Sequence, residues 1–257
     1  MFLLNKNTYF ILLIIILNVL FSNHAFSTHT FKFPRIILYN QMNTNGSQVE
    51  FHFVKESRYQ DTYLLKMRMI SNKNKNINFH KINSYIEPMD FSLLSSNIFF
   101  NNNKILEYKF INTKNFNNDR ISIIKFIKDD KIVYNGYEPV INEHPTMDLL
   151  SSIVLASYKV FNKKNFKKIE PFNYIESKFE KFQLTNVKNV SIKYVRSFKL
   201  EYQGKRYITN VISIAENKKG KEIRYYIWKN KNGFYYPLKI SGLGQNFSNL
   251  WAINIIP

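Results

Sequence analysis

The sequence predicts a mostly β protein: a curved antiparallel sheet or half-barrel with one main helix packed against it. Short runs of β-branched and aromatic residues recur from Phe31 onward, clusters of Asn, Asp, Gly and Lys separate them, and one segment has helical periodicity. Hydrophobic residues make up 45% of the chain and aromatic residues 16%, which is enough for a packed core. The chain is therefore expected to be globular.

In the first half of the chain, five runs have the composition of strands: Phe31 to Tyr39, Val49 to Lys55, Tyr63 to Ser71, Ile77 to Ile86 and Ile105 to Ile111. The apolar segments 121–127 and 131–134 flank the polar pair Asp129-Asp130, and this arrangement predicts a hairpin. We interpret the two adjacent aspartates as a solvated turn rather than as a catalytic acid and base.

One helix is expected at about residues 146–161. Pro145 lies near its start, Asp148 suits the positive end of the helix dipole, and apolar residues recur at helical spacing from Leu149 to Val154. The broad apolar face predicts that this helix is buried in the core. We interpret Asp148 as a residue that stabilises the helix start rather than as a catalytic group.

The C-terminal third predicts a meander of four strands. Alternation with period two in its first strand places six residues on one face: Ile192, Tyr194, Arg196, Phe198, Leu200 and Tyr202. The other face is expected to be solvated. The turns are expected at Gln203-Gly204, at 217–220 and at Asn232-Gly233, which is the strongest hairpin signal in the chain.

Residues 1–27 have the order of parts of a secretory signal peptide. Lys6 gives a cationic start, Tyr9 to Phe21 form an apolar run, and Ala25-Phe26-Ser27 supply small residues for a peptidase. We expect cleavage after Ser27, which leaves residues 28–257 as a single β-rich periplasmic domain. The alternative is an uncleaved N-terminal membrane anchor, because the apolar run approaches the length of a spanning helix.

Cysteine is absent from the sequence, which excludes disulfides, thiolate metal sites, cysteine nucleophiles and a lipid-modified cysteine. Together with the signal, this favours a soluble protein of a bacterial envelope. The formal charge of +19 rests mainly on lysine in a chain that is also rich in Asn, a bias typical of AT-rich genomes. The arginines, which best suit phosphate recognition, are scattered, so no nucleic-acid partner is expected.

Signatures of catalysis are missing from the sequence. No glycine belongs to a Gly-x-Ser-x-Gly elbow, the histidines lack metal-ligand spacing, and Gly242-Leu243-Gly244 is interpreted as a turn rather than a dinucleotide loop. We therefore expect a non-enzymatic protein without metal or cofactor. A hydrolase with a spatially assembled site is the least favoured hypothesis.

Aromatic residues are the strongest candidates for function. The predicted ligand-lining residues are Tyr194, Phe198, Tyr202, Tyr226 and Trp228. They fall on single faces of two strands, so a curved sheet could present them in a hollow that binds a lipid or another apolar or amphipathic ligand. The alternative interpretation is that they form the core under the helix.

A second hypothesis is an interaction module for anionic envelope polymers or lipid headgroups. Its basis is a basic, solvated strand surface that includes Lys193, Lys199 and Lys229. The sequence carries no signal for an oligomeric state.

Two segments resemble an exported bacterial family, domain of unknown function 3108. They are Asp148-Leu149-Leu150-Ser151-Ser152 and Trp228 followed by Pro237-Leu238-Lys239-Ile240. The resemblance extends in outline from Phe51 to the C-terminus, and it implies a periplasmic protein with a curved antiparallel sheet around a helix, similar to lipoprotein carriers, without known chemistry. The chain departs from the family in its Lys and Asn content and in the helix segment 154–158.

Overall fold

The described residues build one sheet of fifteen strands in the order β8-β7-β6-β5-β4-β3-β2-β1-β15-β14-β13-β12-β11-β10-β9. The computed structural model describes residues 30–41, 48–56, 62–73, 76–100, 103–112, 120–128, 131–139, 145–162, 169–175, 187–216, 222–243 and 249–257. Residues 1–27, the predicted signal peptide, lie outside this description, and so do Asp129 and Asp130. The fold described below is that of the compact unit Lys32–Pro257.

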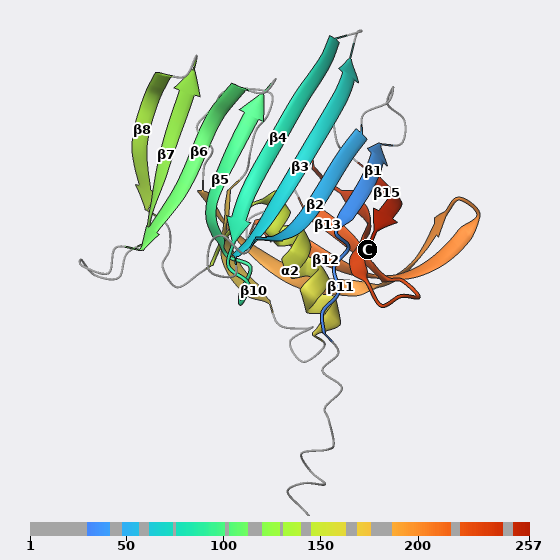
Figure 1. The fold of residues 1–257 in the computed structure, drawn as a ribbon. Helices are drawn as coiled ribbons and strands as arrows, with labels where there is room; N and C mark the ends of the chain where they lie inside the picture. Colours follow the sequence, from blue (N-terminus) through green and yellow to red (C-terminus); the bar gives the residue numbers. More distant parts are fainter. Residues whose placement is uncertain are drawn as a thin grey trace, which may run out of the picture. The chain divides into compact units, whose positions relative to one another are not determined.

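Eight strands form the N-terminal arm: β1 (Ile36–Gln41), β2 (Gln48–Glu56), β3 (Thr62–Lys73), β4 (Asn76–Ile86), β5 (Leu93–Phe100), β6 (Asn103–Asn112), β7 (Arg120–Lys128) and β8 (Lys131–Pro139). They stand side by side in Figure 1. The chain continues through β9 (Thr146–Met147) and helix α2 (Leu149–Phe161). The C-terminal arm follows: β10 (Glu170–Ile175), β11 (Val187–Tyr202), β12 (Lys205–Glu216), β13 (Ile223–Lys229), β14 (Tyr235–Ser241) and β15 (Asn249–Ile256).

The two arms are meanders joined at the middle of the sheet, where β1 pairs with β15. The strand pairs are antiparallel except β9 with β10, which is parallel. The ends of the strand order, β8 and β9, follow each other in the sequence. The prediction of a mostly β protein, with a curved antiparallel sheet or half-barrel and one main helix packed against it, is confirmed.

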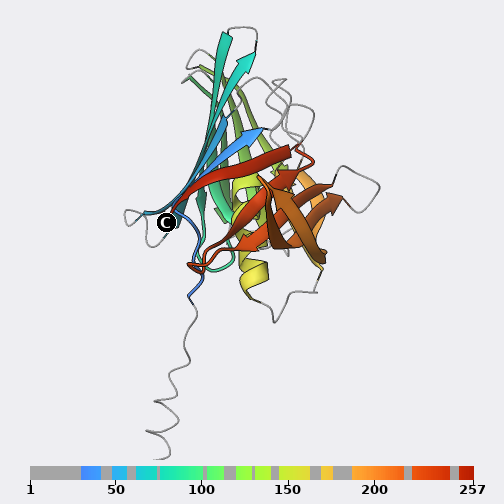
Figure 2. The ribbon, with the colours of Figure 1, turned by 90° about the vertical axis from the view of Figure 1, so that its right-hand side faces the viewer.

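Helix α2 contacts strands of both arms, namely β3 and β4 on one side and β13 and β14 on the other (Figures 1 and 2). Its buried residues include Leu150, Ile153 and Val154, as the apolar spacing predicts. Near its C-terminal end, the ring of Tyr158 lies 5.2 Å from that of Phe91 in the β4–β5 connection. Phe161 lies 5.6 Å from Tyr235 of β14, also between ring centroids.

The helix begins three residues later than predicted. Thr146 and Met147 pair with Asn173 and Tyr174 of β10 and thereby form β9. Asp148 is then the N-cap residue, with an extended backbone and a side chain that accepts a hydrogen bond from the backbone N–H of Ser151. Thr146 and Met147, which the sequence analysis placed in the first turn of the helix, therefore belong to a strand.

The predicted hairpins are confirmed at β7–β8, at β11–β12 and at β13–β14. Gln203 and Gly204 have φ values of 50° and 71°, as a two-residue hairpin turn requires. Sequence reasoning missed β5, β10 and β15, because serine, asparagine or proline interrupts their apolar pattern.

Gly242 follows β14 where the chain passes close to the backbone before β13. Its φ is +90°, and a Cβ atom built there would lie 2.0 Å from the carbonyl oxygen of Glu222. Gly233 has a similar φ of +82°, but a Cβ atom at that residue would have no other atom within 4 Å. A substitution at Gly233 would therefore introduce backbone strain alone, whereas one at Gly242 would add a steric clash.

Gly242→Ala is expected to lower the free energy of unfolding more than Gly233→Ala. Gly233→Ala should cost about 1–2 kcal/mol, because an L-residue is strained in this conformation. Gly242→Ala should cost about 2–5 kcal/mol, because the backbone of Glu222 must also move. Urea denaturation of both variants checks this, and equal losses would contradict the close approach at Gly242.

Candidate functional site

Val195 is a bulged residue in β11, and it changes which side chains share a face. Tyr194 pairs with Ile212 of β12, whereas Arg196 pairs with the next residue of β12, Val211. Paired side chains share a face, and adjacent residues of a regular strand point to opposite faces. The Arg196 side chain, and every second side chain after it, therefore lies on the face of β11 opposite to that of Tyr194.

The prediction that Tyr194, Phe198 and Tyr202 share a face is consequently wrong for Tyr194. Phe198 pairs with Thr209, three residues away from the partner of Tyr194, so the two aromatic side chains lie on opposite faces. The Tyr194 hydroxyl lies 3.2 Å from the Ser197 hydroxyl in an exposed position. Simple alternation fails here because it assumes a strand without a bulge.

The same bulge divides the predicted basic strand surface. Lys193 pairs with Ser213, and Lys199 pairs with Ile208. These partners are five residues apart on β12, so Lys193 and Lys199 lie on opposite faces. Both are exposed, as is Lys229, but the first two do not form one continuous surface.

Tyr225 shows which face of β13 meets the helix. Its hydroxyl lies 2.8 Å from the Ser152 hydroxyl of α2, and its side chain is fully buried. Tyr226 and Trp228 point the other way, since they alternate with Tyr225 and Ile227 along the strand. Because Val211 pairs with Tyr226, Phe198 shares their face, which we call the outer face.

The end of the β11–β12 hairpin folds back over this outer face. The Tyr202 ring stacks on the Trp251 ring of β15, with centroids 4.6 Å apart and an interplanar angle of 17°, although three strands separate β11 from β15 in the sheet order. Phe198 makes an edge contact with Tyr226 at 5.9 Å. The aromatic residues of the outer face thus pack against one another rather than under the helix.

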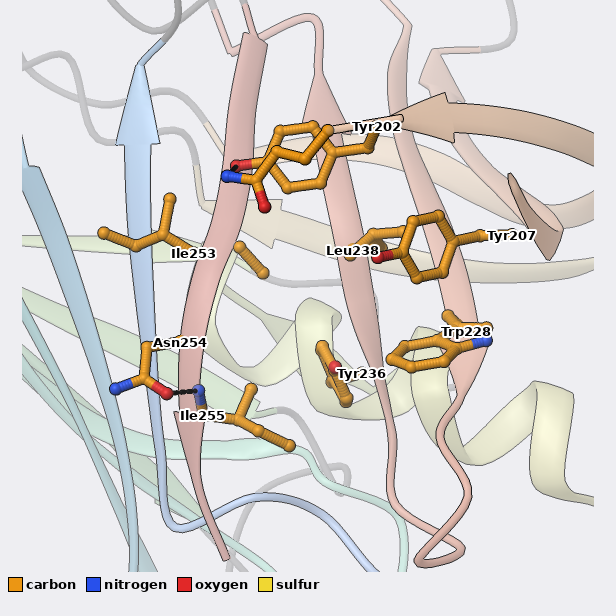
Figure 3. Close-up of a pocket in the computed structure, with 10 residues that line it drawn as sticks. Tyr202, Tyr207, Trp228, Tyr236, Leu238, Ile253, Asn254 and Ile255 are labelled. Atoms are coloured by element: carbon orange, nitrogen blue, oxygen red, sulfur yellow. Dashed lines mark hydrogen bonds between the residues drawn. The ribbon is translucent and has the colours of Figure 1, made fainter. Parts of the chain in front are cut away.

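An aromatic pocket of about 200 Å³ lies beneath the folded-back hairpin. Four rings from consecutive strands line it: Tyr202, Tyr207, Trp228 and Tyr236. Gln203, Leu238 and residues 252–255 complete the lining. Figure 3 shows Tyr207, Trp228 and Tyr236 on one side and Ile253, Asn254 and Ile255 of β15 on the other.

Two of the five predicted ligand-lining residues, Tyr202 and Trp228, line this pocket. Phe198 and Tyr226 lie on the same outer face beside it. Sequence reasoning missed Tyr207 and Tyr236. Tyr236 pairs directly with Trp228 across the Asn232-Gly233 hairpin, so counting the hairpin register would have found it.

Burial favours the neutral form of two tyrosine hydroxyls of the pocket, those of Tyr202 and Tyr236. Burial raises the pKa of Tyr236, and the neighbouring Tyr207 adds to the effect. Burial, again with Tyr207, raises the pKa of Tyr202. At physiological pH these hydroxyls can therefore donate and accept hydrogen bonds.

Two cations already lie against rings of the outer face. The Lys239 ammonium is 4.8 Å from the Trp251 ring centroid and 5.4 Å from that of Tyr226. The Arg196 guanidinium is 5.2 Å from the centroid of Phe198. Partial burial lowers the pKa of Lys239.

A second candidate cluster surrounds Asp148 at the start of α2. One carboxylate oxygen accepts hydrogen bonds from the N–H and hydroxyl of Ser151, at 2.9 and 3.0 Å, and the other accepts one from the Ser84 hydroxyl of β4. The Ser84 hydroxyl also lies 3.1 Å from that of Ser96 on β5. Burial raises the pKa of Asp148, although the bonds from Ser151 and Ser84 act in the opposite direction. These contacts cap the helix and attach it to the N-terminal arm.

Within the described ranges, no three His, Asp or Glu side chains gather as a potential metal site. In the same ranges, no helix has the length and apolar character to cross a membrane.

Comparisons with known proteins bear on the fold. No family model matches the chain, and no curated protein matches it in sequence. Among solved structures it is similar to a β-barrel-like protein of domain of unknown function DUF1849 from Brucella abortus, with a TM-score of 0.50 and 8% identity over 88% of this chain and 98% of that chain. At this identity the likeness shows the fold alone. It supports an uncharacterised β-barrel-like class, not the domain of unknown function 3108 family in particular.

The Asp148→Asn variant is expected to gain stability relative to the wild type as the pH rises. A raised folded-state pKa means that the contribution of Asp148 is largest below the unfolded carboxyl pKa of about 3.9 and is lost as the pH rises through the folded-state value. Asparagine keeps a capping oxygen, can donate to Ser84 and does not titrate. The difference between the two proteins should grow by about 1.4 kcal/mol for each unit by which the pKa is raised.

Urea denaturation across the acidic to neutral range measures this difference. Asp148→Ala serves as the control, and it should be less stable by about 1–2 kcal/mol through loss of the cap. A difference between Asp148→Asn and the wild type that stays constant with pH would contradict the raised pKa.

Proposed function

We propose that this protein is an exported, non-enzymatic binding protein that holds a small amphipathic ligand in the aromatic pocket. The observation that carries the proposal is the convergence of four aromatic side chains from β11, β12, β13 and β14 around one pocket on the outer face. Concave sites lined by aromatic side chains with a few polar groups are typical of small-molecule binding.

The lining favours a ligand with both an apolar and a polar part. The ring faces of Trp228 and the tyrosines offer apolar surface, and burying it favours binding by about 25 cal/mol per Å². The hydroxyls of Tyr207 and Tyr236, with the amides of Gln203 and Asn254, add hydrogen-bonding groups at the same pocket.

The Asn254 amide oxygen already accepts a hydrogen bond from the Ile255 N–H, and the Gln203 amide donates one to the Tyr202 hydroxyl. A ligand with a polar part can use the remaining capacity of these groups, which a purely apolar ligand cannot.

The volume of the pocket limits how much of a lipid-like ligand can be bound inside it. Sites for drug-sized ligands usually span about 300–1,000 Å³, whereas this pocket measures about 200 Å³. It therefore suits a small molecule or the end of a larger one, such as a headgroup, rather than a whole acyl chain.

Export belongs to the proposal and is supported by the sequence alone. The cationic start, apolar run and small residues of 1–27 provide the signal, and a chain without cysteine needs no disulfide formation after transport. In this proposal the mature protein begins at Thr28 and acts in the periplasm.

The Trp228→Ala variant is expected to lose the bound ligand. The protein is purified from the periplasmic fraction of the native host, and its mass should be that of a chain that begins at Thr28. Wild-type protein and the Tyr194→Ala control should carry the same co-purified small molecule. Trp228→Ala should carry at least about tenfold less, because it lacks a wall of the pocket.

Mass spectrometry of organic extracts measures the bound molecule, and circular dichroism confirms that each variant is folded. Trp228→Phe keeps an aromatic ring at this position and should retain most of the ligand. This variant distinguishes loss of the pocket wall from a general folding defect. Equal ligand in Trp228→Ala and Tyr194→Ala, or none in the wild type, would contradict the proposal.

A further inference from the structure

The Trp228 ring stands nearly perpendicular to two other rings of the aromatic pocket. Trp228 meets Tyr207 at an interplanar angle of 84° with centroids 5.0 Å apart, and it meets Tyr236 at 76° and 5.8 Å. Tyr202 forms a further wall, held in place by its stack on Trp251. Rings arranged in this way form the walls of a box, which is the geometry of an aromatic cage.

The described residues that line the cage carry no formal charge. They are four aromatic residues, two residues with side-chain amides and four aliphatic residues. A primary ammonium or a metal ion in such a site would lack anionic ligands. A quaternary ammonium group has no N–H to satisfy and gains its stabilisation from the electron-rich faces of the rings.

The outer face already stabilises cations in this way. Lys239 lies over Trp251, and the Trp251 ring also stacks on Tyr202, a wall of the cage. Within the described part of the chain, no carboxylate forms an ion pair with Lys239. Contact with aromatic rings is therefore one means by which this face accommodates a positive charge, beside the ion pair of Arg224 with Glu222.

We propose that the aromatic cage binds a quaternary ammonium group that belongs to a zwitterion with a nearby phosphate or carboxylate. This inference rests on the proposed function and names the ligand class of the same pocket. The ligand is either a free solute or the headgroup of a lipid, since both present the same chemistry.

A positive charge next to the cage favours a zwitterion over a bare cation. Lys205 pairs with Tyr202 and therefore shares its face, and the Lys205 side chain is exposed. The chain as a whole has a formal charge of +19, which disfavours a free cation. An anionic group joined to the ammonium by a short linker would lie within reach of the Lys205 ammonium.

Isothermal titration with two matched ligands tests the proposal. Phosphocholine carries the trimethylammonium group, and neohexyl phosphate has the same shape with a quaternary carbon in place of nitrogen. We expect phosphocholine to bind at least about tenfold more tightly, because both ligands can pack against the rings but only the charged group gains the electrostatic attraction of the ring faces. Trp228→Leu should abolish this preference, whereas Tyr207→Phe, which keeps the ring, should retain it.

The possible outcomes separate the inference from the proposed function. Equal binding of both ligands would overturn the quaternary ammonium and leave a pocket for amphipathic ligands. No binding of either ligand, with another compound co-purifying in a Trp228-dependent manner, would also overturn this inference alone. Flotation with phosphatidylcholine vesicles, competed by free phosphocholine, identifies a lipid headgroup, and binding of phosphocholine without flotation identifies a free solute.

Discussion

Helix α2 fills the inner side of the sheet, and the rest of the structure depends on how it is held there. Its N-terminal N–H groups are buried and need partners, which Asp148 supplies while also bonding to Ser84 of the N-terminal arm. One turn further, Ser152 bonds to Tyr225 of the C-terminal arm. Ring contacts near the other helix end again reach both arms. The helix thus holds together two meanders whose direct connection in the sheet is the β1–β15 pair.

The helix covers only the inner face of the C-terminal arm. The aromatic residues on its outer face must therefore be shielded from solvent by another part of the chain. The bulge at Val195 allows the long β11–β12 hairpin to bend, and its end packs over β13 to β15. The Tyr202–Trp251 stack closes this second, smaller layer. The aromatic pocket lies within this layer, so the pocket and the helix lie on opposite faces of the same strands.

The sequence predicts the fold class well because period-two runs and the one amphipathic helix are local signals. It also identifies Tyr202 and Trp228 from the wealth of aromatic residues on alternating positions. It misplaces Tyr194, since a one-residue bulge leaves no mark in the alternation. The contact between Tyr202 and Trp251 joins residues that are distant in the chain and in the strand order, and such long-range packing has no local pattern.

The outer aromatic face closes on itself through the stack of Tyr202 on Trp251, away from the helix. Nuclear Overhauser effects between the ring protons of Tyr202 and Trp251 in the free protein test it most directly, because rings stacked at 4.6 Å give strong signals. The structure predicts these signals together with signals between Phe198 and Tyr226. Their absence in a protein whose Tyr225 still contacts the helix would contradict the folded-back hairpin and, with it, the pocket.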